Sequence, residues 1–180
     1  MFKKFLVLLF SLGLILPATV SAVSYKAVPK ASPTPTPVPV VNSFELFWPM
    51  SAGKTMQSKV YFLKTLKEEV RGLLIFGSAQ KADYRIFLSI KRMLEAEALM
   101  KANVSDLANK TLDSASKNLD KANSNLTNAR NSGDTSQDVK DEINTRVANL
   151  KKFVSSLMVT YPDYKDKLQA ILEKLNLLTI

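Results

Sequence analysis

The chain has neither cysteine nor histidine among its 180 residues. Without cysteine no disulfide can form, so the fold must be held together by packing alone. The absence of both residues also removes the usual ligands of zinc, copper and haem, and histidine is the commonest general base in enzymes. We therefore predict that the protein is not an enzyme and has no metal site, no cofactor and no catalytic residue.

Glycine is scarce, with five residues in the whole chain, and no run with the alternating pattern of a strand follows Thr55. Apolar residues recur instead at spacings of three and four, which indicates helices. The sequence predicts an all-α bundle of about five helices with long antiparallel hairpins. A first helix is marked by Met56, Val60, Leu63, Leu66, Val70 and Leu74 and stops near Gly77.

Ser78 is placed to cap a second helix, which a break at Asn103 and Ser105 ends. The third helix has the most regular pattern, with a heptad seam of alternating alanine and leucine that lets a partner helix approach closely. Its seam residues are Ala108, Leu112, Ala115, Leu119, Ala122, Leu126 and Ala129.

Gly133 is predicted to end the third helix, and Asp134 with Gln137 to form a capping box for the next. Two C-terminal helices are expected at about residues 135–160 and 162–178, the second with Pro162 at its first position. Their apolar stripes are Ile143, Val147, Leu150, Val154 and Leu157, then Leu168, Ile171, Leu172, Leu175 and Leu178.

Long apolar runs are also missing, apart from Phe5 to Leu16 near the N-terminus. Twelve helical residues reach about 18 Å, short of a hydrocarbon core about 30 Å thick. With Lys3 and Lys4 before the run and small residues up to Ala22 after it, residues 1–22 are typical of a signal peptide. We predict cleavage near Ala22 and an extracytoplasmic location, secreted or in the cell envelope; the alternative is an uncleaved N-terminal anchor.

Most of the prolines lie in the following segment, which reads VPKASPTPTPVPVV. Alternating proline keeps a chain extended, so residues 23–43 are predicted to be a disordered Pro/Thr-rich linker. Residues 44–180 are predicted to be a single helical domain.

The stretch WPMSAGKT from Trp48 to Thr55 ends like a phosphate-binding loop. Such a loop needs glycine five residues before Gly53, because its backbone N–H groups must converge on the anion. Trp48 occupies that position and Pro49 removes a donor. The match is therefore interpreted as chance.

Positive charge is concentrated in residues 54–92, which carry nine basic and three acidic side chains within a chain of formal net charge +9. This segment could bind an anionic partner, although a solvated helix face is the common reason for such charges. Because an exported protein would not meet nucleic acid, anionic lipid or a wall polymer is the expected partner. The residues predicted to contact an anionic surface are Lys64, Lys67, Arg71, Arg85 and Arg92.

Aromatic residues are interleaved with these charges, and at helical spacing we expect them to fill the core: Tyr61, Phe62, Phe76, Tyr84 and Phe87. The close carboxylate pairs Glu68–Glu69 and Glu95–Glu97 would suit a hydrolase only if both members faced one bond. Neighbours one or two apart on a helix point in different directions, so neither pair qualifies.

Four blocks of sequence resemble a family: Trp48-Pro49, YFLKTLKE from Tyr61, FGSAQKA from Phe76 and KRMLEAEAL from Lys91. They are similar to successive parts of a bacterial extracytoplasmic helical domain of unknown function. That domain occurs in free-standing exported proteins and in the outer part of anti-sigma-factor-like membrane proteins, and no activity is assigned to it. The resemblance covers about residues 47–130 and implies that WPMSAGKT leads into the first helix, with Lys54 or Thr55 near its start.

The predicted function is a non-catalytic interaction or sensing module of the bacterial cell envelope, with an unknown envelope protein or wall polymer as partner. One alternative is a binder of polyanions or anionic lipid through the basic face of the first two helices, and a less favoured one is an envelope hydrolase. A heptad seam also permits a helical dimer. We expect a monomer.

Overall fold

The computed structural model describes residues 41–133 and 136–178, which all belong to one compact unit. Within these ranges the chain forms α-helices, one short 3-10 helix and no strand, so the predicted all-α bundle is confirmed. The helices are α1 (Ser43–Phe47), α2 (Tyr61–Leu73), α3 (Ser78–Lys101), α4 (Ser105–Ser132), α5 (Gln137–Thr160) and α6 (Lys165–Asn176), with the 3-10 helix at Pro162–Tyr164.

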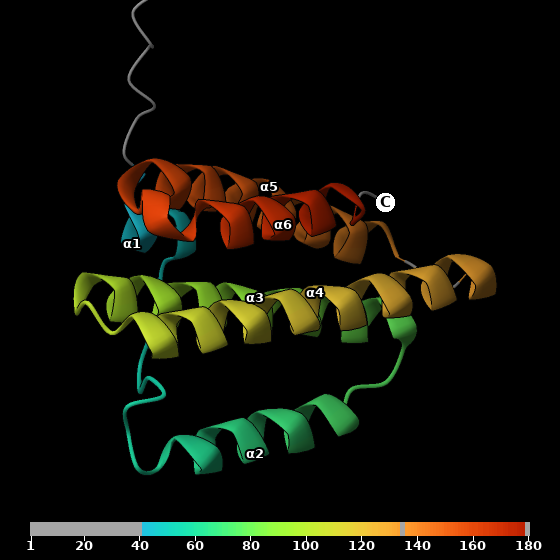
Figure 1. Ribbon diagram of the computed structural model, residues 1–180. Helices are drawn as coiled ribbons and strands as arrows, with labels where there is room; N and C mark the ends of the chain where they lie inside the picture. The colour runs from blue at the N-terminus through green and yellow to red at the C-terminus, as the bar shows by residue number, and fades with distance from the viewer. Residues whose placement is uncertain (1–40, 134–135, 179–180) are drawn as a thin grey trace, which may run out of the picture. The chain divides into compact units, whose positions relative to one another are not determined.

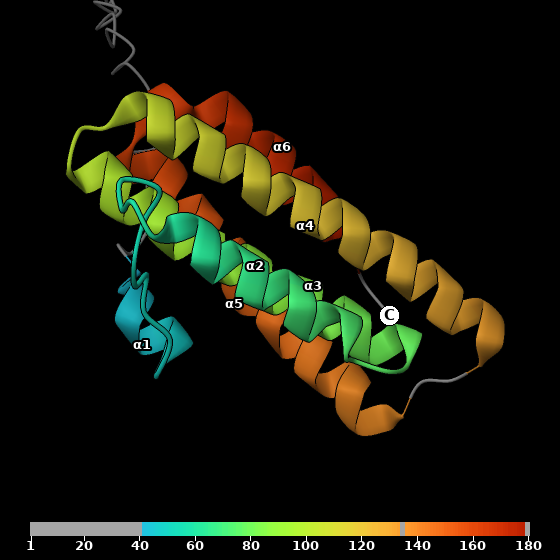
Figure 2. The same ribbon diagram turned by 90° about the horizontal axis from the view of Figure 1, so that it is seen from below.

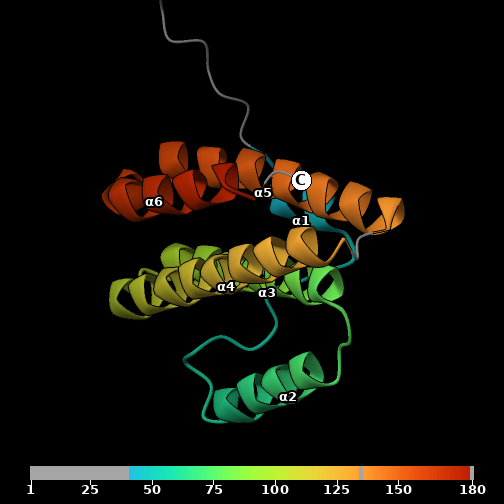
Figure 3. The ribbon, with the colours of Figure 1, turned by 90° about the vertical axis from the view of Figure 1, so that its right-hand side faces the viewer.

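The helices of this unit are arranged in three layers (Figure 1). The hairpin of α3 and α4 forms the middle layer, α5 and α6 cover one side of it with α1 beside them, and α2 lies alone on the other side. The same layering is visible from the side (Figure 3), and the view from below shows α2 running along α3 (Figure 2). Among the described residues, α2 is therefore the long helix that has no other helix beside it in its own layer.

The close contact of α3 with α4 follows from the small residues of the α4 seam. All seven seam residues are buried with at most 1% of their surface exposed, as predicted. The Ser89 hydroxyl of α3 donates to the Ala115 carbonyl of α4 at 3.1 Å. Alanine at alternate seam positions leaves room for this approach, and leucine fills the space between.

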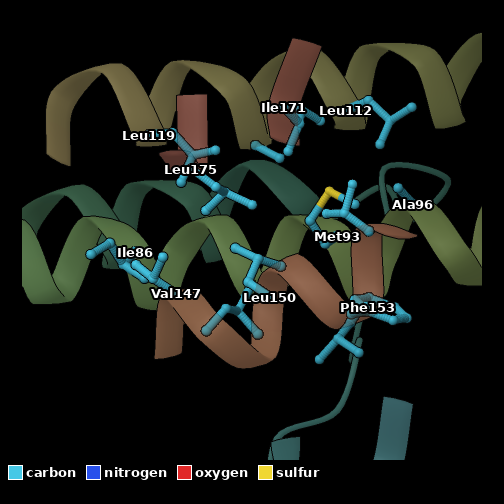
Figure 4. Packing of buried hydrophobic residues seen from close by; sticks show 14 of the residues in the cluster. Ile86, Met93, Ala96, Leu112, Leu119, Val147, Leu150, Phe153, Ile171 and Leu175 are labelled. Carbon is cyan, nitrogen blue, oxygen red and sulfur yellow. The ribbon is translucent and has the colours of Figure 1, made fainter. Parts of the chain in front are cut away.

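The second half of the core lies between the hairpin and the layer of α5 and α6. Figure 4 shows Met93 of α3, Leu119 of α4, Leu150 of α5 and Ile171 of α6 among the side chains of one cluster. The apolar stripes predicted for the two C-terminal helices are buried, except that Leu172 is half-buried. Pro162 begins the 3-10 helix that leads into α6, close to its predicted role.

The predicted helix ends are correct in part. Gly133 ends α4 in the left-handed conformation with φ of 67°, as expected. Ser78 is the first residue of α3 rather than its cap, because Gly77 holds the N-cap position. Gln137 is likewise the first residue of α5, after Ser136, so it is not the third residue of a capping box. Asp134, the other proposed member of that box, lies outside the described residues.

The sequence did not predict α1, a short helix in the lead-in segment. Asn42 caps it by accepting a hydrogen bond from the Phe44 amide at 3.0 Å. Phe47 at its end is buried and meets Phe153 of α5 edge to face. The predicted signal peptide and most of the linker lie outside the described residues, so the boundaries near Ala22 and at residue 43 stay predictions.

Candidate functional site

Helix α2 turns its polar side toward the bundle. Residues at helical spacing on this side are Tyr61, Lys64, Glu68 and Gly72, of which Glu68 and Gly72 are buried. They face α3, where Arg92 is 4% exposed and Glu95 is fully buried. A helix with a clear apolar stripe normally buries that stripe, so this orientation is the reverse of the usual one.

Ion pairs and hydrogen bonds join the two helices in what we call the charged layer, made of Tyr61, Lys64 and Glu68 of α2 with Lys91, Arg92 and Glu95 of α3. The Glu95 carboxylate accepts hydrogen bonds from the Tyr61 hydroxyl at 2.9 Å, from Arg92 at 2.7 Å and from the Lys64 ammonium.

The Glu68 carboxylate completes the charged layer from the α2 side. It pairs with Lys91 at 2.7 Å and also with Arg92. Arg92 thus lies between the two carboxylates, and three cations face two anions. The layer carries a formal charge of +1.

Electrostatics favour the ionised form of Glu68. Burial by itself would raise the pKa of this carboxyl, but the hydrogen bond from Lys91 and the charge of Arg92 outweigh it and lower the pKa below its ordinary value. Burial and the nearby Glu95 charge raise the pKa of Tyr61, so its hydroxyl keeps its proton and donates to Glu95.

Gly72 permits the close approach of α2 to α3. A methyl group at this position would lie 3.2 Å from the Tyr84 ring, closer than carbon atoms ordinarily pack. The Tyr84 hydroxyl donates to the Glu68 carbonyl at 2.9 Å beside it. Glycine inside a helix lowers helix stability by about 1 kcal/mol relative to alanine, and here this loss accompanies a tight contact between helices.

Lys64 also holds the WPMSAGKT segment. Its ammonium donates to the carbonyls of Ala52 at 3.2 Å and of Lys54 at 2.9 Å. A phosphate-binding loop directs amide N–H groups inward, whereas this loop directs carbonyl oxygens toward a cation. The expected helix start at Lys54 or Thr55 is wrong, because α2 begins at Tyr61.

The side of α2 that points away from the bundle is apolar. We define the outer face of α2 as Phe62, Leu63, Leu66, Val70, Leu73 and Leu74, whose side chains are 48–77% exposed. Eight of the twelve large apolar residues exposed in the described ranges lie between Val60 and Phe76. The expectation that the aromatic residues of this segment fill the core is wrong for Phe62 and Phe76, correct for Tyr84, and partly met by Tyr61 and Phe87.

The five residues predicted to contact an anionic surface do not form one face. Lys64 and Arg92 belong to the charged layer, and Arg85 makes a two-pronged ion pair with Glu69 at 2.9 and 3.0 Å. Lys67 and Arg71 are exposed on α2, beside its outer face. Lys64, Lys67 and Arg71 line a common pocket, whereas Arg85 borders a different one.

Two carboxylates that are far apart in sequence are brought together by the charged layer. Sequence reasoning compared only neighbours along the chain, so it missed the combination of Glu68 with Glu95. The signal was the surroundings of Glu95, where Met93, Leu94, Ala96 and Leu99 are all apolar. A carboxylate in such a sequence is buried and therefore needs a cationic partner.

The lowered pKa of Glu68 predicts that acid weakens the attachment of α2. A carboxyl group whose pKa is lower in the folded than in the unfolded state contributes stability above the unfolded value, and the contribution is lost as the pH falls through the folded pKa. We expect hydrogen exchange of α2 amides to accelerate relative to α4 between about pH 5 and about pH 3.

Glu68→Gln should remove this pH dependence, because the α2 amides should then exchange quickly already at neutral pH. Glu173→Gln, on the exposed side of α6, should behave like the unaltered protein. Equal acid sensitivity of α2 in both variants would contradict a role for Glu68. Asp83 acts in the opposite direction, because burial raises its pKa, so it cannot produce the predicted effect.

Two further kinds of functional feature, metal sites and membrane-spanning helices, are not found in the part of the chain that the structure describes. No three acidic side chains come together there as metal ligands would. None of the helices in residues 41–133 and 136–178 has both the length and the apolar character to cross a membrane.

Fold and site together define a helical-bundle domain in which a peripheral helix is attached through buried charges and carries an exposed apolar face. The family described as domain of unknown function (DUF5667) matches residues 55–152, more than half of the chain. The chain belongs to this family. The match contains the charged layer and the outer face of α2 and ends within α5. No curated protein and no solved structure matches the chain.

Proposed function

We propose that this domain is a non-catalytic interaction module of the cell envelope, which docks through the outer face of α2 onto an anionic lipid surface. The observation that carries the proposal is the apolar side of a regular amphipathic helix directed away from its own bundle. Such a helix lies in the interface of a bilayer with its apolar side chains among the acyl chains. The signal-peptide character of residues 1–22 supports an extracytoplasmic location.

The size of the apolar face suits this role. Fully covering one large apolar side chain contributes about 1.5–3 kcal/mol, so covering six gives a gross gain of roughly 10 kcal/mol before the losses of association. An exposed patch of this kind on a monomer is a mark of an interaction site. The same side chains contribute little to the bundle, because they do not touch its core.

The charges beside the face favour an anionic surface. Lys67 and Arg71 each follow a residue of the outer face and so lie about 100° around the helix from it. In this position their long side chains reach the headgroup level while the apolar residues enter the bilayer. Each such cation near an anionic membrane contributes about 1 kcal/mol.

A second copy of the chain is a weaker candidate for the occupant. A helix of 13 residues is about 20 Å long and about 10 Å wide, so its outer face alone falls well short of the roughly 800 Å² that each partner of a stable dimer buries. Two such faces would also bring Lys67 and Arg71 of both copies together. We propose a non-catalytic role because both carboxylates of the charged layer, Glu68 and Glu95, are already ion-paired with cations.

Cosedimentation of residues 23–180 with lipid vesicles tests the proposal, since this chain lacks the apolar run Phe5 to Leu16. We expect binding to vesicles that contain phosphatidylglycerol, weaker binding to neutral phosphatidylcholine, and a decrease with salt. The double variant Leu66→Gln/Leu73→Gln should weaken binding at least about tenfold, because two side chains lose their burial in the bilayer.

The matched control is Val159→Gln/Leu177→Gln, which removes two similarly exposed apolar side chains from α5 and from the end of α6. It should bind like the unaltered protein. Equal losses in both double variants would overturn the proposal. So would a concentration-dependent dimer that Leu66→Gln/Leu73→Gln abolishes, or salt-resistant retention by whole envelopes without vesicle binding, because these results identify a second copy or a protein partner.

A further inference from the structure

A pocket of about 310 Å³ lies between α2 and α3, on the flank next to the outer face. Four cations line it: Lys64, Lys67 and Arg71 from α2, and Lys91 from α3. Glu68 is the one carboxylate among the described lining residues. We call this the cationic pocket.

The charges of the cationic pocket are only partly balanced. Lys64 pairs with Glu95, and Lys91 pairs with Glu68. Within the described residues, the Lys67 side chain has no ion pair or hydrogen bond, and the Arg71 side chain has no contact of this kind beyond its position over the Tyr84 ring. Two positive charges therefore remain without an anion in a concave site, where low-dielectric walls strengthen their field.

Aromatic walls hold two of the cations in place. The guanidinium of Arg71 lies 5.6 Å from the centre of the Tyr84 ring, and the Lys91 ammonium lies 5.8 Å from the centre of the Phe87 ring. The two rings are themselves stacked, with centres 6.1 Å apart. Cations fixed against ring faces lose less freedom on binding a ligand than mobile surface lysines do.

We propose that the cationic pocket binds a small ligand through a phosphate group with at least two negative charges, either a phosphomonoester or a diphosphate. Two uncompensated cations match two negative charges, and the planar fork of Arg71 suits phosphate oxygens. The volume is near the lower limit of small-molecule sites, about 300 Å³, so the ligand is small or only its headgroup enters.

Calorimetric titration of the purified protein with inorganic pyrophosphate at low salt tests this site. We expect saturable binding and, in nuclear magnetic resonance spectra, shifts centred on the amides of Lys67 to Gly72. The variant Lys67→Gln/Arg71→Gln should weaken binding about tenfold, because it removes the two free charges. The control Lys110→Gln/Lys117→Gln removes two exposed cations from α4 and should leave the affinity unchanged.

The pocket does not depend on the proposed lipid docking, because pyrophosphate is titrated without lipid. Leu66→Gln/Leu73→Gln should keep pyrophosphate binding even if it loses vesicle binding, so the two proposals fail separately. Vesicles of equal surface charge distinguish the sources of the phosphate. Stronger binding to phosphatidic acid than to phosphatidylglycerol, lost in Lys67→Gln/Arg71→Gln, indicates a lipid headgroup, and equal binding indicates a soluble phosphate ester.

Three results would overturn the proposal that the cationic pocket binds phosphate. One is the absence of saturable pyrophosphate binding at millimolar concentration. Another is an equal loss of affinity in the α4 control, which would show that only overall charge matters. The third is a set of spectral shifts spread over all basic surfaces rather than centred on α2.

Discussion

Glu95→Ala is expected to lower the free energy of unfolding by about 3–5 kcal/mol, because removal of one partner leaves buried charge without compensation. Glu95 is fully buried and accepts hydrogen bonds from Tyr61, Lys64 and Arg92. After its removal Arg92 keeps only Glu68, and the Tyr61 hydroxyl loses its acceptor. Urea unfolding followed by circular dichroism measures the effect.

Glu97→Ala is the matched control on the same helix. Glu97 pairs with Lys101, whose side chain is 60% exposed, and ion pairs open to solvent contribute about 0–1 kcal/mol. We therefore expect a loss under about 1 kcal/mol at Glu97. A loss of the same small size at Glu95 would show that water, rather than the charged layer, surrounds this carboxylate in solution.

A triple variant separates stability from orientation. Glu68→Met/Arg92→Met/Glu95→Met removes the three most buried charges together, and buried ion networks replaced by apolar side chains are often as stable or more stable. We expect it to recover much of the stability that Glu95→Ala loses. Lys64 and Lys91 keep access to water, since their side chains are 17% and 23% exposed.

We therefore infer that the charged layer determines which way α2 faces more than it stabilises the bundle. Rotating α2 by half a turn about its own axis would direct Leu66 and Val70 toward α3 and give an apolar interface between the two helices. Glu68 would then leave its partners Lys91 and Arg92, and Arg92 and Glu95 would be buried without it. The buried charges exclude the turned arrangement and keep the apolar side outward.

The sequence predicted the parts of the fold that depend on local periodicity. The α4 seam and the apolar stripe of α5 are regular over several turns, and both helices bury the predicted residues. Periodicity also predicted an amphipathic helix near α2. It could not give the direction of that helix, because the usual rule that the stripe faces the core fails where the core helix itself carries buried charges.

The candidate site was harder to predict for the same reason. Lys67 and Arg71 were recognised as basic surface residues, but Arg92 was placed with them although it is buried between two carboxylates. The ion pairs of the charged layer that join α2 to α3 connect residues 23 to 31 positions apart, and no local pattern encodes such contacts. The apolar residues around Glu95 were the available clue, because a charge in such surroundings must find a partner.

Phe153→Ala and Phe62→Ala make the same chemical change, one in the core and one on the surface. We expect a large loss of stability from the first and almost none from the second. Phe153 is 1% exposed and its ring centre lies 5.4 Å from that of Phe47. Truncating a buried phenylalanine lowers the free energy of unfolding by about 3–5 kcal/mol. Phe62 is 62% exposed on the outer face of α2, so its truncation should change stability by less than about 0.5 kcal/mol.

The same pair of variants tests where the structural domain ends, because Phe153 is the first residue beyond the family match. A large loss there means that the core continues past residue 152 and includes α1 through Phe47. A double-mutant cycle of Phe47→Ala with Phe153→Ala should give a coupling of about 0.5–1.5 kcal/mol from the ring contact. No coupling would mean that α1 is not docked, whereas a stable Phe62→Ala that no longer binds vesicles would separate the docking face from the folding core.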